Sequence, residues 1–199
     1  MFRKYTAERG SFMRFINRKD LRAILANHRL WLETQYTQGE RANLSDVYLG
    51  KMDLSKVDLR WADLRGANFC ESNLSAGSLF KADMRGANLS KANLSKTIFR
   101  EADLSCSCLY STNLREANLS AANLSEAILC ESDLRGADLT GAILSKANLY
   151  KAGLNKAILC YANLSYADLK ETDLREADFR GADLGAADLR GADLRGVIW

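Results

Sequence analysis

Proline is absent from the 199-residue chain, and histidine occurs once, as His28. A chain without proline keeps a backbone N–H at every position, which suits a fold held by continuous backbone hydrogen bonding. A hydrolytic triad needs a histidine beside its nucleophile, and the chain offers no second one. These two absences favour a structural or binding role over hydrolytic catalysis.

Cysteine is scarce, and its spacing does not indicate a metal site. The five cysteines are an odd number without a disulfide framework, which indicates reduced thiols. Cys106 and Cys108 form C-x-C, not the C-x-x-C pairs typical of zinc sites, and are expected to be surface thiols. Each glycine of "FRGADLGAADLRGADLRG" occupies a repeat position, so no phosphate-binding loop is predicted. We expect no catalytic residues, no metal and no cofactor.

Long apolar runs are also missing. No stretch stays apolar over the roughly 18 residues that a membrane span needs, and no signal-peptide pattern precedes the polar repeats. We therefore expect a cytoplasmic protein without a membrane span.

A five-residue repeat dominates what is present. The run "ANLSKANLSKTIFREADLS", residues 87–105, returns four times to nearly the same pattern. Five residues match neither the period of an α-helix, which is about 3.6, nor the period of two of a strand. A chain that turns a corner in every repeat would instead return over itself after four repeats, so that residue n stacks on residue n+20. The pattern predicts a solenoid.

The repeat runs without a phase slip to the end of the sequence. Between Leu44 and Leu194, every fifth residue is Leu in 27 of 31 repeats, and the residue two before it is Ala in 21. Trp199 falls on the same centre position. Inward leucines spaced by small residues would fill the interior, each Leu contributing about 1.5–3 kcal/mol. Residues 40–199 are expected to form about eight coils.

The repeat, written here as "ADLRG", "ANLSK" and "ADLKE", resembles that of the pentapeptide-repeat proteins. This resemblance implies an all-β solenoid, the right-handed quadrilateral β-helix known for that family. The stretch "LRAILANHRLWLETQYTQGERANL" is similar to the helical lead-in of many members, and implies an N-terminal α-helical cap. Three regions are expected: an arm over residues 1–16, a helical cap over 17–39, and the β-helix over 40–199.

The first 40 residues differ in charge from the repeats. They hold eight Lys or Arg and four Asp or Glu, a net charge of +4, whereas residues 41–199 hold 20 and 21, a net charge of −1. Asn17 and Asp20 form an N-terminal capping pair, and His28 lies on the apolar face of the predicted helix. A lid over the first coil is the favoured role, with contact to nucleic acid or anionic lipid as the alternative. Residues 1–16 are expected to form a short helix or a mobile arm.

The outward positions carry the candidate partner surface. On the face centred on Leu49, the corner residues alternate largely in charge, as in Lys51, Glu71 and Lys91. Beside them lies a largely apolar strip, which we name the strip and which consists of Cys108, Tyr110, Ile128, Cys130 and Tyr150. Such a row is a candidate surface for a protein partner. The alternative is that stacked side chains only shield the sheet.

Three functions are compatible with these features of the sequence. The first is a rigid, non-enzymatic scaffold for protein–protein interaction whose partner the sequence does not name. The second is implied by the quinolone-resistance branch of the family, whose members resemble duplex DNA to type II topoisomerases. That branch is generally more acidic, whereas here arginines interleave with the aspartates of the last coils. An enzyme is the third and least favoured function, and direct nucleic-acid binding is not expected.

The C-terminal end of the solenoid is a candidate dimer surface. Ile198 and Trp199 are apolar where most repeats carry Asp or Asn followed by Leu. An exposed β-helix end is a self-complementary surface for a two-fold partner. We expect a homodimer through this end, and the alternative is that Trp199 folds over the end as a lid.

Overall fold

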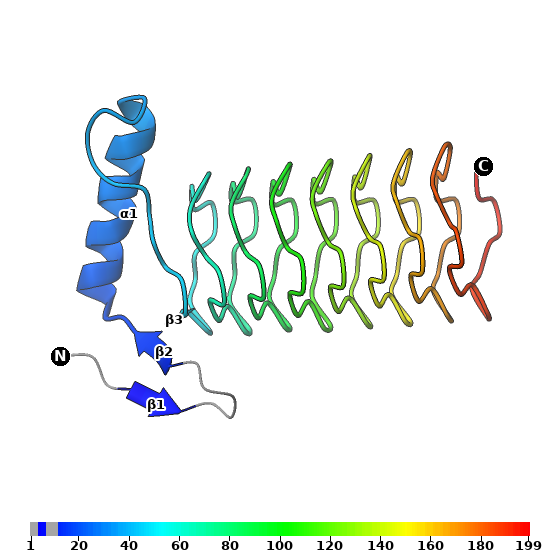
Figure 1. Ribbon diagram of the computed structural model, residues 1–199, viewed down its shortest axis with the longest axis horizontal. Coiled ribbons are helices and arrows are strands. Elements are labelled where there is room, and N and C mark those ends of the chain that lie inside the picture. Colours follow the sequence, from blue (N-terminus) through cyan, green and yellow to red (C-terminus); the bar gives the residue numbers. More distant parts are fainter. Residues whose placement is uncertain (1–3, 7–11) are drawn as a thin grey trace.

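The computed structural model describes residues 4–6 and 12–199, and Figure 1 shows a rod of stacked coils with a helix at its N-terminal end. The named elements are β1 (Lys4–Thr6), β2 (Phe12–Phe15), α1 (Arg18–Glu33) and β3 (Val47–Tyr48). The coils follow without insertion to the C-terminus, each at nearly constant spacing (Figure 1). No helix in the described part of the chain is long and apolar enough to cross a membrane.

Residue n pairs with residue n+20 along the whole rod, as the five-residue period predicts. Parallel bridges join Asn68 to Asn88 and Asn88 to Cys108, and the same register continues to Ile198. In each step the centre residue donates its N–H to the coil above, as Leu64 does to the Asp83 carbonyl at 2.7 Å. Four repeats therefore make one coil with four faces.

We name the four faces in chain order: face A is centred on Leu44, face B on Leu49, face C on Leu54 and face D on Leu59. Faces B and D lie on opposite sides of the rod. The Leu of each repeat is the centre residue, and the second residue after it is the corner residue. Centre residues from Leu59 to Leu174 are fully buried, and so are most of the small residues two places earlier. The predicted inward rows of Leu and Ala are confirmed.

Corner residues adopt the left-handed backbone conformation, which lets the chain turn in every repeat. Lys96 has a φ of 57° and Glu116 a φ of 55°, while Gly86 and Gly136 both have a φ of 66°. A backbone bond from the residue after nearly every corner closes the turn, as from the Ala117 N–H to the Leu114 carbonyl at 3.1 Å. Glycine takes this conformation without steric cost, whereas other residues do so only because the stacked coils hold them there.

Helix α1 begins as predicted but ends earlier than Gly39. The Asn17 side chain caps it by accepting the Asp20 N–H at 2.8 Å. The helix ends at Glu33 because Gln35 and Tyr36 adopt left-handed conformations, with φ of 52° and 73°. The predicted cap segment over residues 17–39 is therefore a helix followed by a turn.

His28 joins α1 to the first coil. Its side chain is fully buried, and its Nδ1 accepts the Ala42 N–H at 3.0 Å. Burial lowers its pKa below the usual value, although the nearby Asp58 carboxylate opposes this shift. Leu21 of the same helix is buried in the core. The side chain at position 28 is thus a packed, neutral acceptor, as its apolar position suggested.

Of the two alternatives for residues 1–16, the short helix is wrong for the described part, which forms two strands. Strand β2 pairs antiparallel with β1 and parallel with β3, so that Arg14 lies opposite Val47. The Arg14 N–H donates to the Asp46 carbonyl at 2.7 Å. Strand β2 therefore extends face B beyond the first coil. Residues 1–3 and 7–11 of the expected arm lie outside the described residues.

Candidate partner surface

In most repeats an outward backbone N–H donates a hydrogen bond to a side chain of the same repeat. The residue before the centre is usually Asn or Asp, and its side-chain oxygen accepts the N–H of the residue after the centre. On face B, Asn88 accepts from Ser90 at 3.0 Å and Asn148 from Tyr150 at 3.0 Å. This local bond satisfies a donor that would otherwise point toward solvent.

The strip interrupts this pattern in two consecutive coils of face B. Cys108 and Ile128 stand where the acceptor is usually Asn or Asp. As a result, neither the Tyr110 N–H nor the Cys130 N–H has an acceptor in another residue among residues 4–6 and 12–199. These two donors lie one coil apart, about 4.8 Å. A partner can therefore reach two stacked backbone donors here that are occupied in most repeats of the rod.

The side chains of the strip are partly exposed and mostly apolar. Ile128 is 45% exposed and Tyr110 is 38% exposed, whereas the other three are half-buried. The Tyr110 hydroxyl donates to Glu131 Oε2 at 2.9 Å, and the Tyr150 hydroxyl to Glu171 Oε1 at 3.2 Å. Both hydroxyls thus bond to corner glutamates, and the tyrosines flank Cys130. The fold brings all five predicted residues together on one face.

The two thiols of the strip are bonded to neighbouring coils. Cys108 Sγ lies 3.1 Å from Ser90 Oγ, and Cys130 Sγ donates weakly to the Asn148 carbonyl at 3.9 Å. Burial raises the pKa of the Cys130 thiol, so it is protonated at neutral pH. The geometry suits contact with a partner rather than nucleophilic chemistry.

Two pairs of the alternating corner residues of face B form ion pairs, while Glu131 accepts from Tyr110 and Ser111 instead. Lys51 Nζ lies 3.6 Å from Glu71 and Lys151 Nζ lies 3.4 Å from Glu171. These pairs are exposed, so each contributes about 0–1 kcal/mol and is screened by salt. The pair of Lys151 and Glu171 borders the strip at Tyr150 without covering it.

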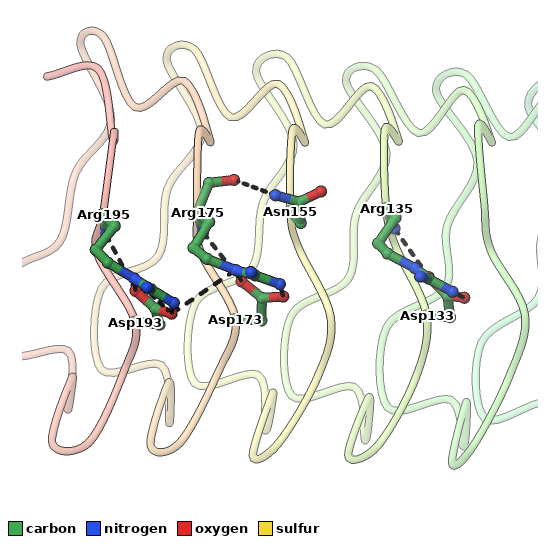
Figure 2. Close-up of polar contacts among 7 residues, drawn as sticks. All are labelled: Asp133, Arg135, Asn155, Asp173, Arg175, Asp193 and Arg195. Carbon is green, nitrogen blue, oxygen red and sulfur yellow. Dashed lines mark hydrogen bonds and ion pairs between the residues drawn. The ribbon is translucent and has the colours of Figure 1, made fainter.

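Each aspartate of the rod that stands two positions before an arginine is neutralised by that arginine. Figure 2 shows Asp173 with Arg175 and Asp193 with Arg195 on face C, each arginine closing on the aspartate two positions earlier. In Asp173 the carboxylate accepts from the Arg175 N–H at 3.2 Å and from Nε at 2.7 Å. Arg195 lowers the pKa of Asp193 to about 2 in this way. The signal that could have found these pairs is the motif Asp-Leu-Arg.

Neighbouring aspartates on other faces are also bound locally. Asp178 pairs with Arg180 at 2.7 Å, and Asp183 accepts the Gly185 N–H at 2.9 Å. Within the described part of the chain, no group of three or more His, Cys, Asp or Glu side chains is placed to hold a metal ion.

The last coil leaves apolar side chains open, the inward Leu194 and Trp199 and the outward Ile198. Leu194, Ile198 and Trp199 are 39%, 50% and 63% exposed. The Trp199 ring packs on Phe179 of the coil before, with ring centroids 5.6 Å apart. Trp199 thus continues the inward column of face D.

A family model described as pentapeptide repeats matches residues 40–76, 78–115, 117–155 and 157–196. No curated protein matches the chain. HetL, a pentapeptide repeat protein involved in heterocyst differentiation regulation from the cyanobacterium Nostoc sp. strain PCC 7120, is 32% identical over 79% of this chain and 78% of its own, with a TM-score of 0.40.

A second solved structure is similar in fold. QnrB1, described as a plasmid-mediated fluoroquinolone resistance protein, is 20% identical over 80% of this chain and 85% of its own, with a TM-score of 0.64. At this identity the likeness concerns the fold alone.

Proposed function

The chain belongs to the pentapeptide-repeat family, whose members form right-handed quadrilateral β-helices, and from this premise we propose that it is a rigid, non-enzymatic scaffold that binds a protein partner through the strip on face B. Proteins of this family are generally structural or interaction proteins. The observation that supports the proposal is the interruption at Cys108 and Ile128, where exposed apolar side chains coincide with unoccupied backbone donors.

The surface of the strip suits a protein partner in its chemistry. Apolar contact with Ile128 and the tyrosine rings removes apolar area from water, and the Tyr110 and Cys130 N–H groups supply direction through hydrogen bonds. The coil stack holds these groups in fixed positions, so little conformational entropy is lost on binding. A partner that presents apolar side chains beside carbonyl oxygens would satisfy both features.

Two matched substitutions test this proposal. Ile128→Asn supplies the missing acceptor to the Cys130 N–H and removes the exposed aliphatic group, so recovery of a bound protein from an extract of the native cells should fall at least about tenfold, the effect of losing a well-packed contact. Ile143→Asn makes the same change at the same repeat position on face A and should leave recovery unchanged. Equal recovery with both variants, each folded, would refute binding at the strip.

The alternative is mimicry of DNA toward gyrase, for which QnrB1 is the relevant neighbour because of its described role in fluoroquinolone resistance. Charge argues against it. A DNA mimic needs a negative surface, whereas most aspartates that precede an arginine are ion-paired with it, and the net charge of the chain is +3. A gyrase supercoiling assay distinguishes the two functions, since the scaffold should neither inhibit gyrase nor relieve its inhibition by a quinolone.

The two ends of the rod are assigned roles in the same proposal. We propose about eight coils, with α1 as the cap of the first coil through Leu21 and His28, and a second copy of the chain covering the last coil at Ile198 and Trp199. We further propose that the protein is cytoplasmic.

Light scattering tests the dimer: the wild type should exceed the 22.1 kDa mass of one chain, and the double variant Ile198→Asp, Trp199→Asp should not. A wild-type mass of one chain at micromolar concentration would contradict the dimer.

A further inference from the structure

A second interruption of the outward pattern lies on face D, opposite the strip. In the motif Asp-x-Arg one carboxylate binds three donors of the same arginine. On this face Asp58 accepts from the Arg60 N–H at 3.3 Å, from Nε at 2.9 Å and from Nη2 at 2.8 Å. Two coils later the motif reads Ile98-Phe99-Arg100. Arg100 therefore lacks the carboxylate that this arrangement is built to hold.

The backbone donors at this point are also unoccupied. Ile98 offers no acceptor to the Arg100 N–H, and Ser78 does not accept from the Phe80 N–H in the coil before. Neither donor has an acceptor elsewhere in the described residues. Stacked coils place them about 4.8 Å apart. Two neighbouring outward N–H groups thus lie beside a guanidinium.

The local charge balance is positive. Lys81 Nζ lies 3.2 Å from Glu101 Oε2, and Arg100 Nε lies 3.3 Å from Glu101 Oε1. One carboxylate therefore serves two cations. The Arg100 side chain remains 60% exposed. An incoming anion would meet an accessible guanidinium with one positive charge left over.

Apolar side chains border these donors. Trp61 and Phe80 meet edge to face with ring centroids 5.8 Å apart, and Lys81 Nζ lies 4.6 Å from the Trp61 ring centroid. The Arg100 guanidinium lies 5.9 Å from the Phe80 ring centroid. Ile98 is 44% exposed beside them. The aromatic rings hold both cations in place, which lowers the entropy lost when a ligand binds.

We propose that this surface is a docking site for an acidic peptide segment of a partner protein. An Asp or Glu carboxylate of the partner takes the place of the missing aspartate and accepts from the Arg100 N–H and guanidinium, with the Phe80 N–H beside it. A neighbouring apolar side chain of the same segment packs on Phe80 and Ile98. The site is separate from the strip and stands whether or not the strip binds a partner.

A titration followed by ¹⁵N–¹H spectra tests the proposal with N-acetyl-aspartyl-phenylalanine amide as the probe. The amide signals of Phe80 and Arg100 should shift and saturate at millimolar probe. N-acetyl-asparaginyl-phenylalanine amide has the same shape without the charge and should bind roughly tenfold more weakly, because hydrogen bonds to a charged group are about twice as strong. The free donors of Tyr110 and Cys130, which have no adjacent arginine, should shift less.

Two variants separate the site from a general effect of charge. Ile98→Asp rebuilds the Asp58–Arg60 arrangement, so the protein should melt as the wild type does while its Phe80 and Arg100 signals no longer respond to the probe. Ile158→Asp makes the same change on the same face before Cys160 and should leave the titration unchanged. Equal binding of the two peptides, an undiminished response of Ile98→Asp, or tighter binding of a thymidine 12-mer at the same amides would overturn the proposal.

Discussion

The side-chain oxygen of Asn148 accepts the backbone N–H of Tyr150 at 3.0 Å, one coil above the point where Ile128 leaves the Cys130 N–H without such an acceptor. The contrast between these neighbouring repeats defines the proposed surface. The Asn or Asp before each centre residue is thus a local cap on an outward donor as well as a polar surface residue. We propose that the rod binds a partner where two positions that lack it stack in consecutive coils, as at Cys108 and Ile128.

The local cap gives a prediction about stability at Ile143. Ile143→Asn should leave the melting temperature unchanged or raise it slightly, because the new amide oxygen can accept the Ser145 N–H, and one such bond contributes about 0.5–1.5 kcal/mol. Asn123 already makes this bond to Ser125 at 3.1 Å one coil below. Thermal unfolding of the wild type and of Ile143→Asn measures this change in melting temperature. A fall of several degrees would mean that the side chain at 143 supports the fold by packing.

The inward row predicts a large loss at Leu114. Leu114→Asn buries an amide without partners and should cost about 2–5 kcal/mol. The buried threonine Thr112 is tolerated because its hydroxyl donates to the Leu89 carbonyl at 2.9 Å. The exposed corner change Glu116→Gln serves as the control. A variant Leu114→Asn that melts within a degree or two of the wild type would contradict the inward position.

The pH dependence of stability should depend on His28. Its folded-state pKa lies below the usual value of about 6.5, so the unfolded chain binds the proton first as the pH falls. The free energy of unfolding should therefore decrease from about pH 7 downward until folded His28 titrates. His28→Asn keeps an acceptor for the Ala42 N–H without a titrating group and should remove this decrease. An identical pH profile for both proteins would exclude His28 as its origin.

A second loss of stability is expected at lower pH from the aspartates of the last coil. Arg190 and Arg195 lower the pKa values of Asp188 and Asp193 to about 2. Because the folded-state values are lowered, the stabilisation is present above about pH 4 and is lost as the pH falls toward 2. The double variant Arg190→Gln, Arg195→Gln should lose less unfolding free energy between pH 4 and pH 2 than the wild type does, as measured by denaturant unfolding.

The control for that loss is Arg115→Gln, since Arg115 follows Asn113 and not an aspartate. It should lose as much stability as the wild type between pH 4 and pH 2. A double variant that behaves like this control would show that the ion pairs do not carry the acid dependence.

The repeat itself could be predicted from the sequence because one rule covers it. A period of five with Leu at the centre fixes the corner, the inward row and the n to n+20 register, and Leu114 occupies the expected buried position. The residues of the strip could be assigned to one face by the same arithmetic. Their hydroxyl and thiol partners could not, because Tyr110 bonds to Glu131 through a side-chain conformation that the period leaves free.

The N-terminal part was less predictable for a physical reason. The pairing of Arg14 with Val47 joins segments more than 30 residues apart, and no local pattern in the first 16 residues reports it. The proposed docking site on face D, at Phe80 and Arg100, could not be predicted from the sequence either. It is visible only as the replacement of Asp by Ile before Arg100, and its meaning depends on the three-donor arrangement seen at Asp58 and Arg60.

Partner capture with two cysteine variants tests the central claim most directly. Cys130 and Cys160 occupy the same repeat position on opposite faces, so Cys130→Lys and Cys160→Lys introduce the same charge at equivalent places. If the strip binds the partner, Cys130→Lys should fold and lose capture from the native extract, while Cys160→Lys should capture as the wild type does. Undiminished capture by a folded Cys130→Lys variant would contradict the account.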